Sequence, residues 1–240
     1  MAPHGEPPAI ETERAAVGEN MHGLQRAIFL DRDGVINRNI WNPDTGAFEA
    51  PLSASQFILI PGVIDALRCL ARAGYLLFLV SNQPNYAKGK AGLNDPAAIH
   101  RTFLKRMQRA DISFTGCFYC FHHPDGRIRD YTGCCLCRKP SPYFLRMASR
   151  SFDVDLPGSW MIGDRATDIV CGQAAGTHTA WVGEAWPEAP RADIRARDLR
   201  EAAQIILYRD TAPGYGAAGR GKGERRLPSA RTSTSDSPLR

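Results

Sequence analysis

The sequence lacks the features that carry a protein into or across a membrane. No apolar run among its 240 residues approaches the roughly 18–20 residues that span a bilayer. Residues 1–20 contain no apolar stretch of the kind that forms a secretory signal. These absences predict a cytoplasmic protein that makes no contact with a membrane.

The body of the chain also lacks a strong charge of either sign. The net charge is +5, and residues 212–240 supply +4 of it through six Lys or Arg and two Asp or Glu. This segment is rich in Gly, Ser and Pro, which is typical of a disordered tail, and a tail that binds nucleic acid is the alternative. Because the remainder is nearly neutral, we do not expect nucleic acid as a partner.

The length and a hydrophobic content of 43% suit one domain with a full core. We predict a disordered extension over 1–22, a folded domain over 23–210 and a disordered basic tail over 211–240, in a protein that is a monomer.

Predicted strands and helices alternate along this domain. Alternation with short connections is typical of an α/β fold, a parallel sheet with helices on both faces. We expect strands at 27–30, 75–80, from about 113, 160–162 and 178–182, and helices from 61, 95 and 141 and over 166–175 and 198–208.

Polar side chains follow three of the predicted strands. In parallel sheets the site lies beyond the carboxyl ends of the strands, where Asp31, Asp33, Ser81-Asn82 and Asp164 are expected to meet. Two carboxylates on one side of a cleft suit a nucleophile and a proton carrier. A divalent cation such as Mg²⁺ would offset their repulsion of a phosphate. Lys139, just before a predicted helix, adds a positive charge for a phosphoryl group.

Each of these motifs is weak alone, because Asp pairs are common in surface turns. Their order along the chain, each at a strand end or helix start, favours a site. DRDGVIN at 31–37, SNQ at 81–83, RKP at 138–140 and IGDRATDI at 162–169 resemble the four motifs of the haloacid-dehalogenase-like (HAD) phosphatases.

The resemblance implies a three-layer Rossmann-like fold and a role for each motif residue. Asp31 would be the nucleophile that forms an aspartyl-phosphate, and Asp33 the general acid and base. Mg²⁺ would be held by Asp31, Asp164 and Asp33, the last through its backbone carbonyl, with Asp168 as a supporting acid. Phosphate or substrate would be bound by Ser81, Asn82, Gln83, Arg138, Lys139, Asn39, Asn42 and Arg165.

Five of the seven cysteines lie in CFYCFHHPDGRIRDYTGCCLCRKP, residues 117–140. This run resembles the metal loop, about 117–138, of one branch of the family, whose pattern falls on Cys120, His122, Cys135 and Cys137. Three thiolates and an imidazole complete a tetrahedral Zn²⁺ site, which would be structural because no position stays open for water.

Several alternatives for the cysteines stay open. Cys134 and His123 are possible substitute ligands. Disulfides are disfavoured without an export signal. A redox pair is disfavoured because Cys134 and Cys135 are adjacent and Cys135 and Cys137 are spaced as C-x-C. A zinc ribbon for nucleic acid would form a separate module, whereas this loop interrupts a sheet. Cys117, Cys69 and Cys171 are expected to pack in the core.

Within this zinc-loop branch, the chain resembles the D-glycero-D-manno-heptose 1,7-bisphosphate 7-phosphatases, which have the histidinol-phosphate phosphatases as relatives. That implies a small phosphorylated sugar as substrate in an open site, since the insertions at 38–56 and 84–93 are short. The chain departs from the heptose enzymes after SNQ, where it reads PNYAKG, and at Arg165, which replaces a Lys. Competing interpretations are another small phosphomonoesterase, a polynucleotide 3′-phosphatase and a zinc-stabilised binding protein without activity.

Overall fold

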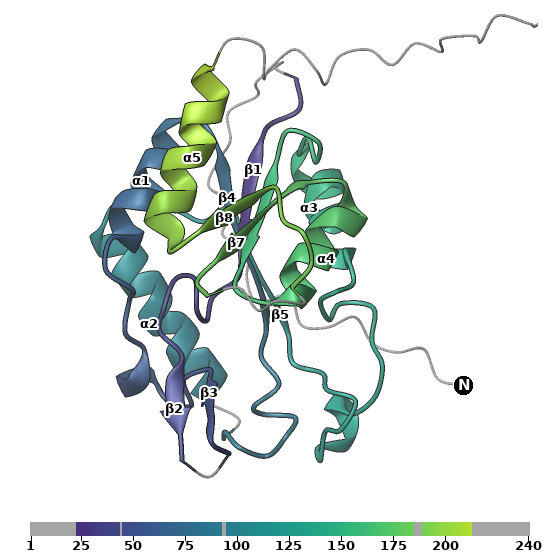
Figure 1. Cartoon of the computed structure of the whole chain (residues 1–240). Helices are drawn as coiled ribbons and strands as arrows, with labels where there is room; N and C mark the ends of the chain where they lie inside the picture. The colour runs from purple at the N-terminus through teal and green to yellow at the C-terminus, as the bar shows by residue number, and fades with distance from the viewer. Residues whose placement is uncertain (1–22, 44, 93–94, 185–188, 213–240) are drawn as a thin grey trace, which may run out of the picture.

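A six-stranded sheet forms the centre of the molecule (Figure 1). The computed structural model describes residues 23–43, 45–92, 95–184 and 189–212. The strands lie in the order β5–β4–β1–β6–β7–β8, and every neighbouring pair is parallel. They are β1 (Ala27–Leu30), β4 (Leu76–Asn82), β5 (Gly116–Cys120), β6 (Trp160–Gly163), β7 (His178–Val182) and β8 (Ile194–Ala196).

Helices cover both faces of this sheet. On one face lie α1 (Val63–Arg72), α2 (Asp95–Arg109) and α5 (Leu199–Thr211), and on the other lie α3 (Tyr143–Phe152) and α4 (Ala166–Ala175) (Figure 1). The arrangement confirms the predicted three-layer α/β fold.

The central strand shows why the sequence folds this way. All four residues of β1 are fully buried. Ile28 and Leu30 belong to the core beneath α1, α2 and α5, whereas Ala27 and Phe29 belong to the core beneath α3 and α4. Because side chains alternate along a strand, a wholly apolar run is needed where both faces are covered.

Two helix ends are formed by residues suited to the position, and a third has no capping side chain. Gly176 ends α4 with φ of 87°, a left-handed conformation that favours glycine. Asp198 caps α5 by accepting a hydrogen bond from the Glu201 amide at 2.9 Å. At the start of α3, Pro142 is the N-cap residue and no side chain caps the helix.

Three short strands were not predicted. β2 (Ile40–Asn42) and β3 (Ala47–Glu49) pair as an antiparallel hairpin between β1 and α1. β8 extends the sheet beyond β7. Each has three residues, too few for a periodic apolar pattern to stand out.

The predicted extension 1–22 and nearly all of the predicted tail 211–240 lie outside the described residues. Within the described ranges, no helix is both long enough and apolar enough to pass through a membrane.

Candidate active site

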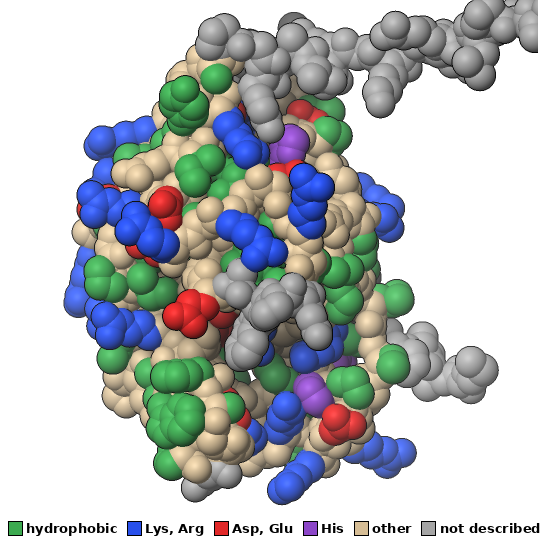
Figure 2. All heavy atoms as spheres, viewed as in Figure 1, with side chains coloured by type: hydrophobic (Ala, Val, Ile, Leu, Met, Phe, Trp, Pro, Cys, Tyr) green, Lys and Arg blue, Asp and Glu red, His purple; other side chains and the backbone are tan. Residues whose placement is uncertain are grey.

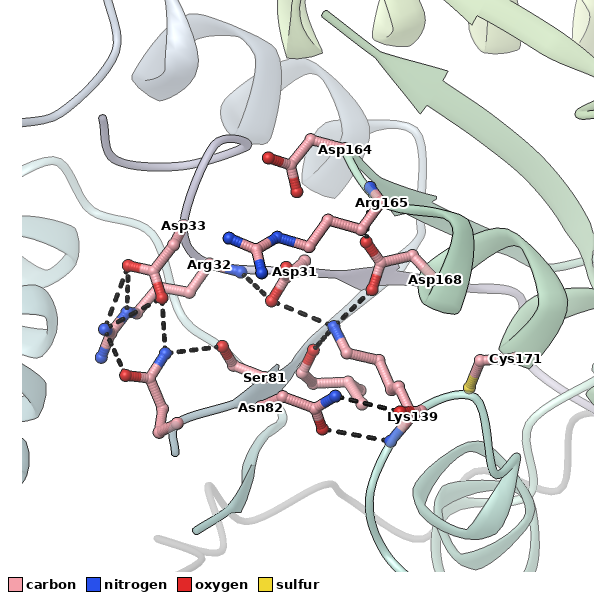
Figure 3. A network of polar contacts seen from close by, with 12 residues as sticks. Asp31, Arg32, Asp33, Ser81, Asn82, Lys139, Asp164, Arg165, Asp168 and Cys171 are labelled. Carbon is pink, nitrogen blue, oxygen red and sulfur yellow. Dashed lines mark hydrogen bonds and ion pairs between the residues drawn. The ribbon is translucent and has the colours of Figure 1, made fainter. Parts of the chain in front are cut away.

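The carboxyl edge of the sheet brings together the polar residues that the sequence places at strand ends (Figure 3). Asp31 follows β1, Ser81 lies near the end of β4, and Asp164 follows β6. Lys139 reaches the same place from the segment before α3. The centre of the site is therefore built from four separate parts of the chain.

Lys139 ties two carboxylates together. Its Nζ lies 3.0 Å from Asp31 Oδ1 and 2.6 Å from Asp168 Oδ1, and it donates to the Val80 carbonyl at 2.7 Å. Burial alone would lower the pKa of Lys139, but the charges of Asp168 and Asp31 raise it above its usual value. Lys139 is therefore a fixed positive charge beside Asp31.

Asp164 is the carboxylate of the site with the fewest hydrogen-bond partners. Burial, and then the charges of Asp31 and Asp168, raise its pKa to about 8. Asp164 Oδ1 is buried and accepts no hydrogen bond, and Oδ2 receives one long contact from Asn39 Nδ2 at 3.4 Å. Burial likewise raises the pKa of Asp168 to about 6, although Lys139 opposes the rise.

Three carboxylates at this place fit a cation. One oxygen each of Asp31, Asp164 and Asp168 lies within 4.8 Å of the others. Oxygen ligands of this kind, with one orphaned buried oxygen among them, suit a hard divalent ion such as Mg²⁺. The structure thus brings Asp168, expected as a supporting acid, into the group itself.

Gly34 makes room for this group. Its φ is +85°, and a Cβ at this position would run into Asp164 Oδ2 and come within 3.0 Å of Asn39 Nδ2. A side chain here would thus be strained and would also displace Asp164.

The Asp33 side chain turns away from the three carboxylates (Figure 3). It accepts hydrogen bonds from Arg32 Nε at 3.1 Å, Asn37 Nδ2 at 2.9 Å and Gln83 Nε2. Its carboxylate is not in the candidate metal group. The predicted metal contact of Asp33 was through its backbone carbonyl and stays a prediction.

Three predicted substrate residues are engaged with other protein groups. Gln83 contacts Asp33 and Ser81, the latter at 2.9 Å. Asn82 exchanges two hydrogen bonds of 3.1 Å with the backbone of Lys139. Asn82 thereby fixes the Lys139 backbone, and substrate binding by these residues stays a prediction.

Three other predicted substrate residues contact protein groups. Arg165 is the N-cap residue of α4, and its charge offsets part of the pKa rise at Asp164. Asn42, on β2, donates to Glu49 at 3.1 Å. Arg138 donates to the His122 carbonyl at 3.1 Å. Substrate binding by these three residues stays a prediction.

The four predicted zinc ligands gather into one group. Cys120 Sγ lies 3.6 Å from Cys135 Sγ, and Cys137 Sγ lies 3.5 Å from Cys135 Sγ and 3.7 Å from His122 Nδ1. All four ligand atoms lie within 4.8 Å of one another. A tetrahedral zinc with bonds of about 2.0–2.3 Å fits such spacings.

Thiol chemistry in this group also suits a cation. Hydrogen bonds from Cys120, Cys135 and His122 lower the pKa of Cys137 to about 5, against the effect of burial. Contacts among the thiols, together with burial, raise the pKa of Cys120 and Cys135. Zinc ligands are bound as thiolates, so a cation would hold these two in the form that Cys137 reaches without it.

The structure decides between the alternative ligands. Cys134 is exposed, and His123 Nδ1 accepts a hydrogen bond from the Asp125 amide at 3.1 Å. Neither belongs to the candidate group. Of the cysteines expected to pack in the core, Cys171 is buried, Cys117 is half-buried, and Cys69 is exposed, contrary to expectation.

The Cys/His group is connected to the aspartate site. Cys137 is two residues from Lys139, and the 84–92 segment after β4 packs on the same loop. Arg127 N donates to the Ala87 carbonyl at 2.6 Å, and the rings of Tyr86 and Tyr131 are 5.2 Å apart.

Arg32 is the functional candidate that the sequence did not reveal. It is 1% exposed, and its guanidinium is bound to Asp33. An arginine beside an aspartate reads as a surface pair, because nothing in the local pattern shows that both side chains are buried.

Comparisons with known proteins agree with this geometry. A family model described as HAD-hydrolase-like matches residues 136–202. D-glycero-beta-D-manno-heptose-1,7-bisphosphate 7-phosphatase of Salmonella typhi is 37% identical over 153 residues, which cover 64% of this chain and 77% of that protein. The protein of the same name from Vibrio cholerae is 39% identical over 155 residues, which cover 64% and 78%.

A solved structure matches as well. The crystal structure of D,D-heptose 1,7-bisphosphate phosphatase from B. bronchiseptica, complexed with magnesium and phosphate, has a TM-score of 0.61 and 28% identity. The match covers 76% of this chain and 98% of that one. Relatives that are named enzymes, together with the intact polar site, remove the support for a binding protein without activity. The chain belongs to the haloacid-dehalogenase-like phosphatases, which hydrolyse phosphoric monoesters.

Proposed function

We propose that this enzyme removes the C7 phosphate of D-glycero-D-manno-heptose 1,7-bisphosphate and leaves heptose 1-phosphate. The observation that carries this proposal is the identity of 37% and 39% with proteins named as phosphatases of this compound. The alternative, histidinol phosphate or another small phosphomonoester, is favoured by the PNYAKG segment after SNQ, which differs from the expected wall of the heptose site.

The reaction proceeds in two displacements. In the first, the Asp31 carboxylate attacks phosphorus, the bond from phosphorus to the C7 oxygen breaks, and Asp33 gives its proton to that oxygen. In the second, water attacks the aspartyl-phosphate and gives a proton to the Asp33 carboxylate, and the bond from phosphorus to Asp31 breaks. The products are heptose 1-phosphate and phosphate, and both aspartates return to their starting states.

Fixed positive charge and hydrogen-bond donors would stabilise the transferring group. Lys139 lies 3.0 Å from Asp31, so its charge would be close to the phosphoryl oxygens. Ser81 would donate its hydroxyl hydrogen, and Arg165 would add a planar guanidinium.

Two metal ions complete the proposal. Mg²⁺ would be held by Asp31, Asp164 and the Asp33 backbone carbonyl, with Asp168 beside it, and would neutralise the phosphate and the carboxylates. Zn²⁺ would be held by the four residues of the Cys/His group and would order the loop that leads to Lys139. The raised pKa values of Asp164 and Asp168 support the first ion, and the close sulfur and nitrogen atoms support the second.

A second, unreacting phosphate would bind beside the zinc loop. Burial, and then the charges of Lys90 and Arg138, lower the pKa of Lys88, and burial with Lys88 and Arg138 does the same at His123. Positive groups that repel one another in this way favour a bound anion, because its negative charge offsets the repulsion. The substrate with phosphates at both ends would thus contact Arg138 while its C7 end faces Asp31.

The sugar would lie in a shallow, open site. The described part of the insertion between β1 and α1 holds the hairpin and a short helix, η1 (Ala54–Gln56). Glu49 on β3 pairs with Lys90 at 2.7 Å, which braces the hairpin against the segment after β4. Asn39 and Asn42 would line this wall and contact sugar hydroxyls.

Phosphate release from a panel of esters tests the proposal. With Mg²⁺ present, kcat/KM would be measured for the α and β anomers of heptose 1,7-bisphosphate, fructose 1,6-bisphosphate, histidinol phosphate and a 3′-phosphorylated oligonucleotide. We expect strong preference for one heptose anomer, with the anomeric phosphate retained in the product. Preference for any other ester would overturn the substrate and leave the chemistry in place.

The location in the cytoplasm and the monomeric state are further predictions. Cell fractionation and light scattering of the purified protein test them.

A further inference from the structure

The Arg32 side chain makes four hydrogen bonds in the site (Figure 3). Its Nε and Nη2 donate to Asp33 Oδ1 at 3.1 and 3.0 Å, and Nη2 also contacts Asp33 Oδ2 at 3.1 Å. Nη2 donates in addition to Gln83 Oε1 at 2.8 Å. A guanidinium with this set of partners fixes the plane of the Asp33 carboxylate.

Arg32 also decides which way the Gln83 amide points. A guanidinium has only donors, so it selects the oxygen of that amide. The amide nitrogen is then directed to Asp33 Oδ2 and to Ser81 Oγ, the latter at 2.9 Å. Because Ser81 Oγ accepts this hydrogen bond, its own hydrogen stays available for a phosphoryl oxygen.

Buried side chains lie beside the Arg32 guanidinium and restrict its movement. The Tyr119 ring on β5 lies 6.0 Å from the guanidinium carbon, and its hydroxyl is 2.9 Å from His100 Nδ1 on α2. Both residues are buried. Arg32 therefore has little freedom to follow a moving ligand.

Asp33 lies where an acid for in-line displacement is needed. In Figure 3, Asp33 lies to one side of Ser81 and Asp31 to the other. A nucleophile and the leaving oxygen stand on opposite sides of phosphorus, so the acid that serves the leaving oxygen must be apart from Asp31.

The two oxygens of Asp33 are unequal. Oδ1 accepts three hydrogen bonds, two from Arg32 and one from Asn37. Oδ2 is left with Arg32 Nη2 and the neutral amide of Gln83. Oδ2 is thus the oxygen that can carry the proton.

We propose that Arg32 and Gln83 are positioning residues that orient Asp33 Oδ2 toward the leaving oxygen. Through the Gln83 amide they also orient the Ser81 hydroxyl, which contacts the phosphate. This inference rests on the proposed role of Asp33 as general acid and base. It assigns Gln83 to the proton carrier and to Ser81, in place of a direct contact with the sugar.

A comparison of leaving groups tests the inference. An alkyl phosphate needs a proton on its leaving oxygen, whereas p-nitrophenyl phosphate expels a stable phenolate without one. The quantity to measure is kcat/KM, since it reports the steps up to departure of the leaving group. For Arg32→Met we expect kcat/KM to fall about 100-fold on the alkyl phosphate and less than about fivefold on the aryl phosphate.

Two further variants guard against simple misfolding. Gln83→Leu keeps the pair between Arg32 and Asp33, and we expect a smaller loss that again falls mainly on the alkyl phosphate. Arg32→Lys restores the charge without the planar fork, and we expect partial recovery. Equal losses on the two substrates in both Arg32→Met and Gln83→Leu, or no loss in either, would overturn the inference.

Arg26→Met is the matched control. Arg26 precedes β1 at the opposite edge of the sheet, pairs with Asp210 at 2.8 Å and lies 4.5 Å from the Tyr75 ring centre. We expect its substitution to leave the ratio of the two kcat/KM values unchanged.

The test separates this inference from the heptose proposal. The alkyl phosphate is heptose bisphosphate if the enzyme accepts it, and otherwise whichever alkyl ester the wild type hydrolyses best. Failure of the heptose assignment thus leaves the leaving-group comparison intact. Equal losses would sink the positioning role and leave the heptose assignment intact.

Discussion

The aspartate group and the Cys/His group differ in how far the protein itself satisfies them. In the first, three carboxylates lie together and Lys139 pairs with two of them, Asp31 and Asp168. Asp164 Oδ1 is buried without a hydrogen-bond partner, and Asp164 and Asp168 have raised pKa values. In the second, three sulfur atoms and one nitrogen close around a point, and Cys137 has a lowered pKa. An unsatisfied oxygen site can exchange water and phosphate, whereas a closed sulfur site can only support.

The two groups meet in a short piece of chain. Cys137 belongs to the closed group, Arg138 contacts the His122 carbonyl, and Lys139 contacts Asp31. Support and reaction are therefore linked by two peptide bonds, and the experiments below ask whether they can be separated.

Asp31→Asn should abolish the reaction and leave the structural support intact, which is the largest expected effect. Loss of the nucleophile should lower kcat by about four orders of magnitude or more. The fold and the zinc content should not change, because Asp31 does not touch the Cys/His group. Phosphate release and metal analysis of the same preparation check both parts, and residual turnover near wild type would refute the nucleophile.

Cys137→Ser should reduce the structural support directly and the reaction only as a consequence. Loss of a structural metal is among the largest single effects on stability, so we expect Tm to fall by about 10 °C. Zinc content should fall with it, and activity should fall only as the loop loses order. A variant that stays folded and fully active without zinc would contradict the structural role.

Magnesium should stabilise the aspartate group more as pH rises. The pKa values of about 8 for Asp164 and about 6 for Asp168 lie above those of the unfolded chain, near 4. As pH rises above about 4, the unfolded chain releases these protons first, so the magnesium-free protein loses stability until Asp168 and then Asp164 titrate.

Bound magnesium removes that loss because it replaces the protons. The gain in Tm on adding magnesium should therefore be about 3–6 °C larger at pH 8 than at pH 5. Thermal melts of protein with zinc in place, with and without magnesium, measure the difference. A gain that does not grow with pH would count against the carboxylate site.

Cys134→Ser should have the smallest effect. Cys134 is exposed and outside the candidate group, so zinc content should be unchanged and stability should shift by less than about 0.5 kcal/mol. It is the matched control for Cys137→Ser, since both lose one thiol from the same loop. Loss of zinc here would show that the ligands are misassigned.

Long apolar patterns allowed most of the fold to be predicted. The strand at 27–30, the helix at 166–175 and the strand at 178–182 lie where expected, because buried runs and helix-stop glycines are local signals. β8 was missed because its three residues, Ile194-Arg195-Ala196, are too few for the alternation of apolar and charged side chains to stand out. The hairpin was missed because its strands owe their pairing to contacts with each other.

The site was predictable as far as types of residue at strand ends could show it. Asp31, Lys139 and Asp164 came together because parallel strands share one edge. The contacts of Gln83 and the burial of Arg32 could not be predicted, since both depend on which side chains fill the space between β1, β4 and β5.

Gly34 sets a limit on how this enzyme can be redesigned. Any other residue there would collide with Asp164 Oδ2, so a library of variants should hold this position constant. Trp41 and Phe48 on the hairpin are more than half exposed and make no demand of this kind. Changes of substrate are therefore best sought at exposed hairpin positions such as these, while position 34 is kept as glycine.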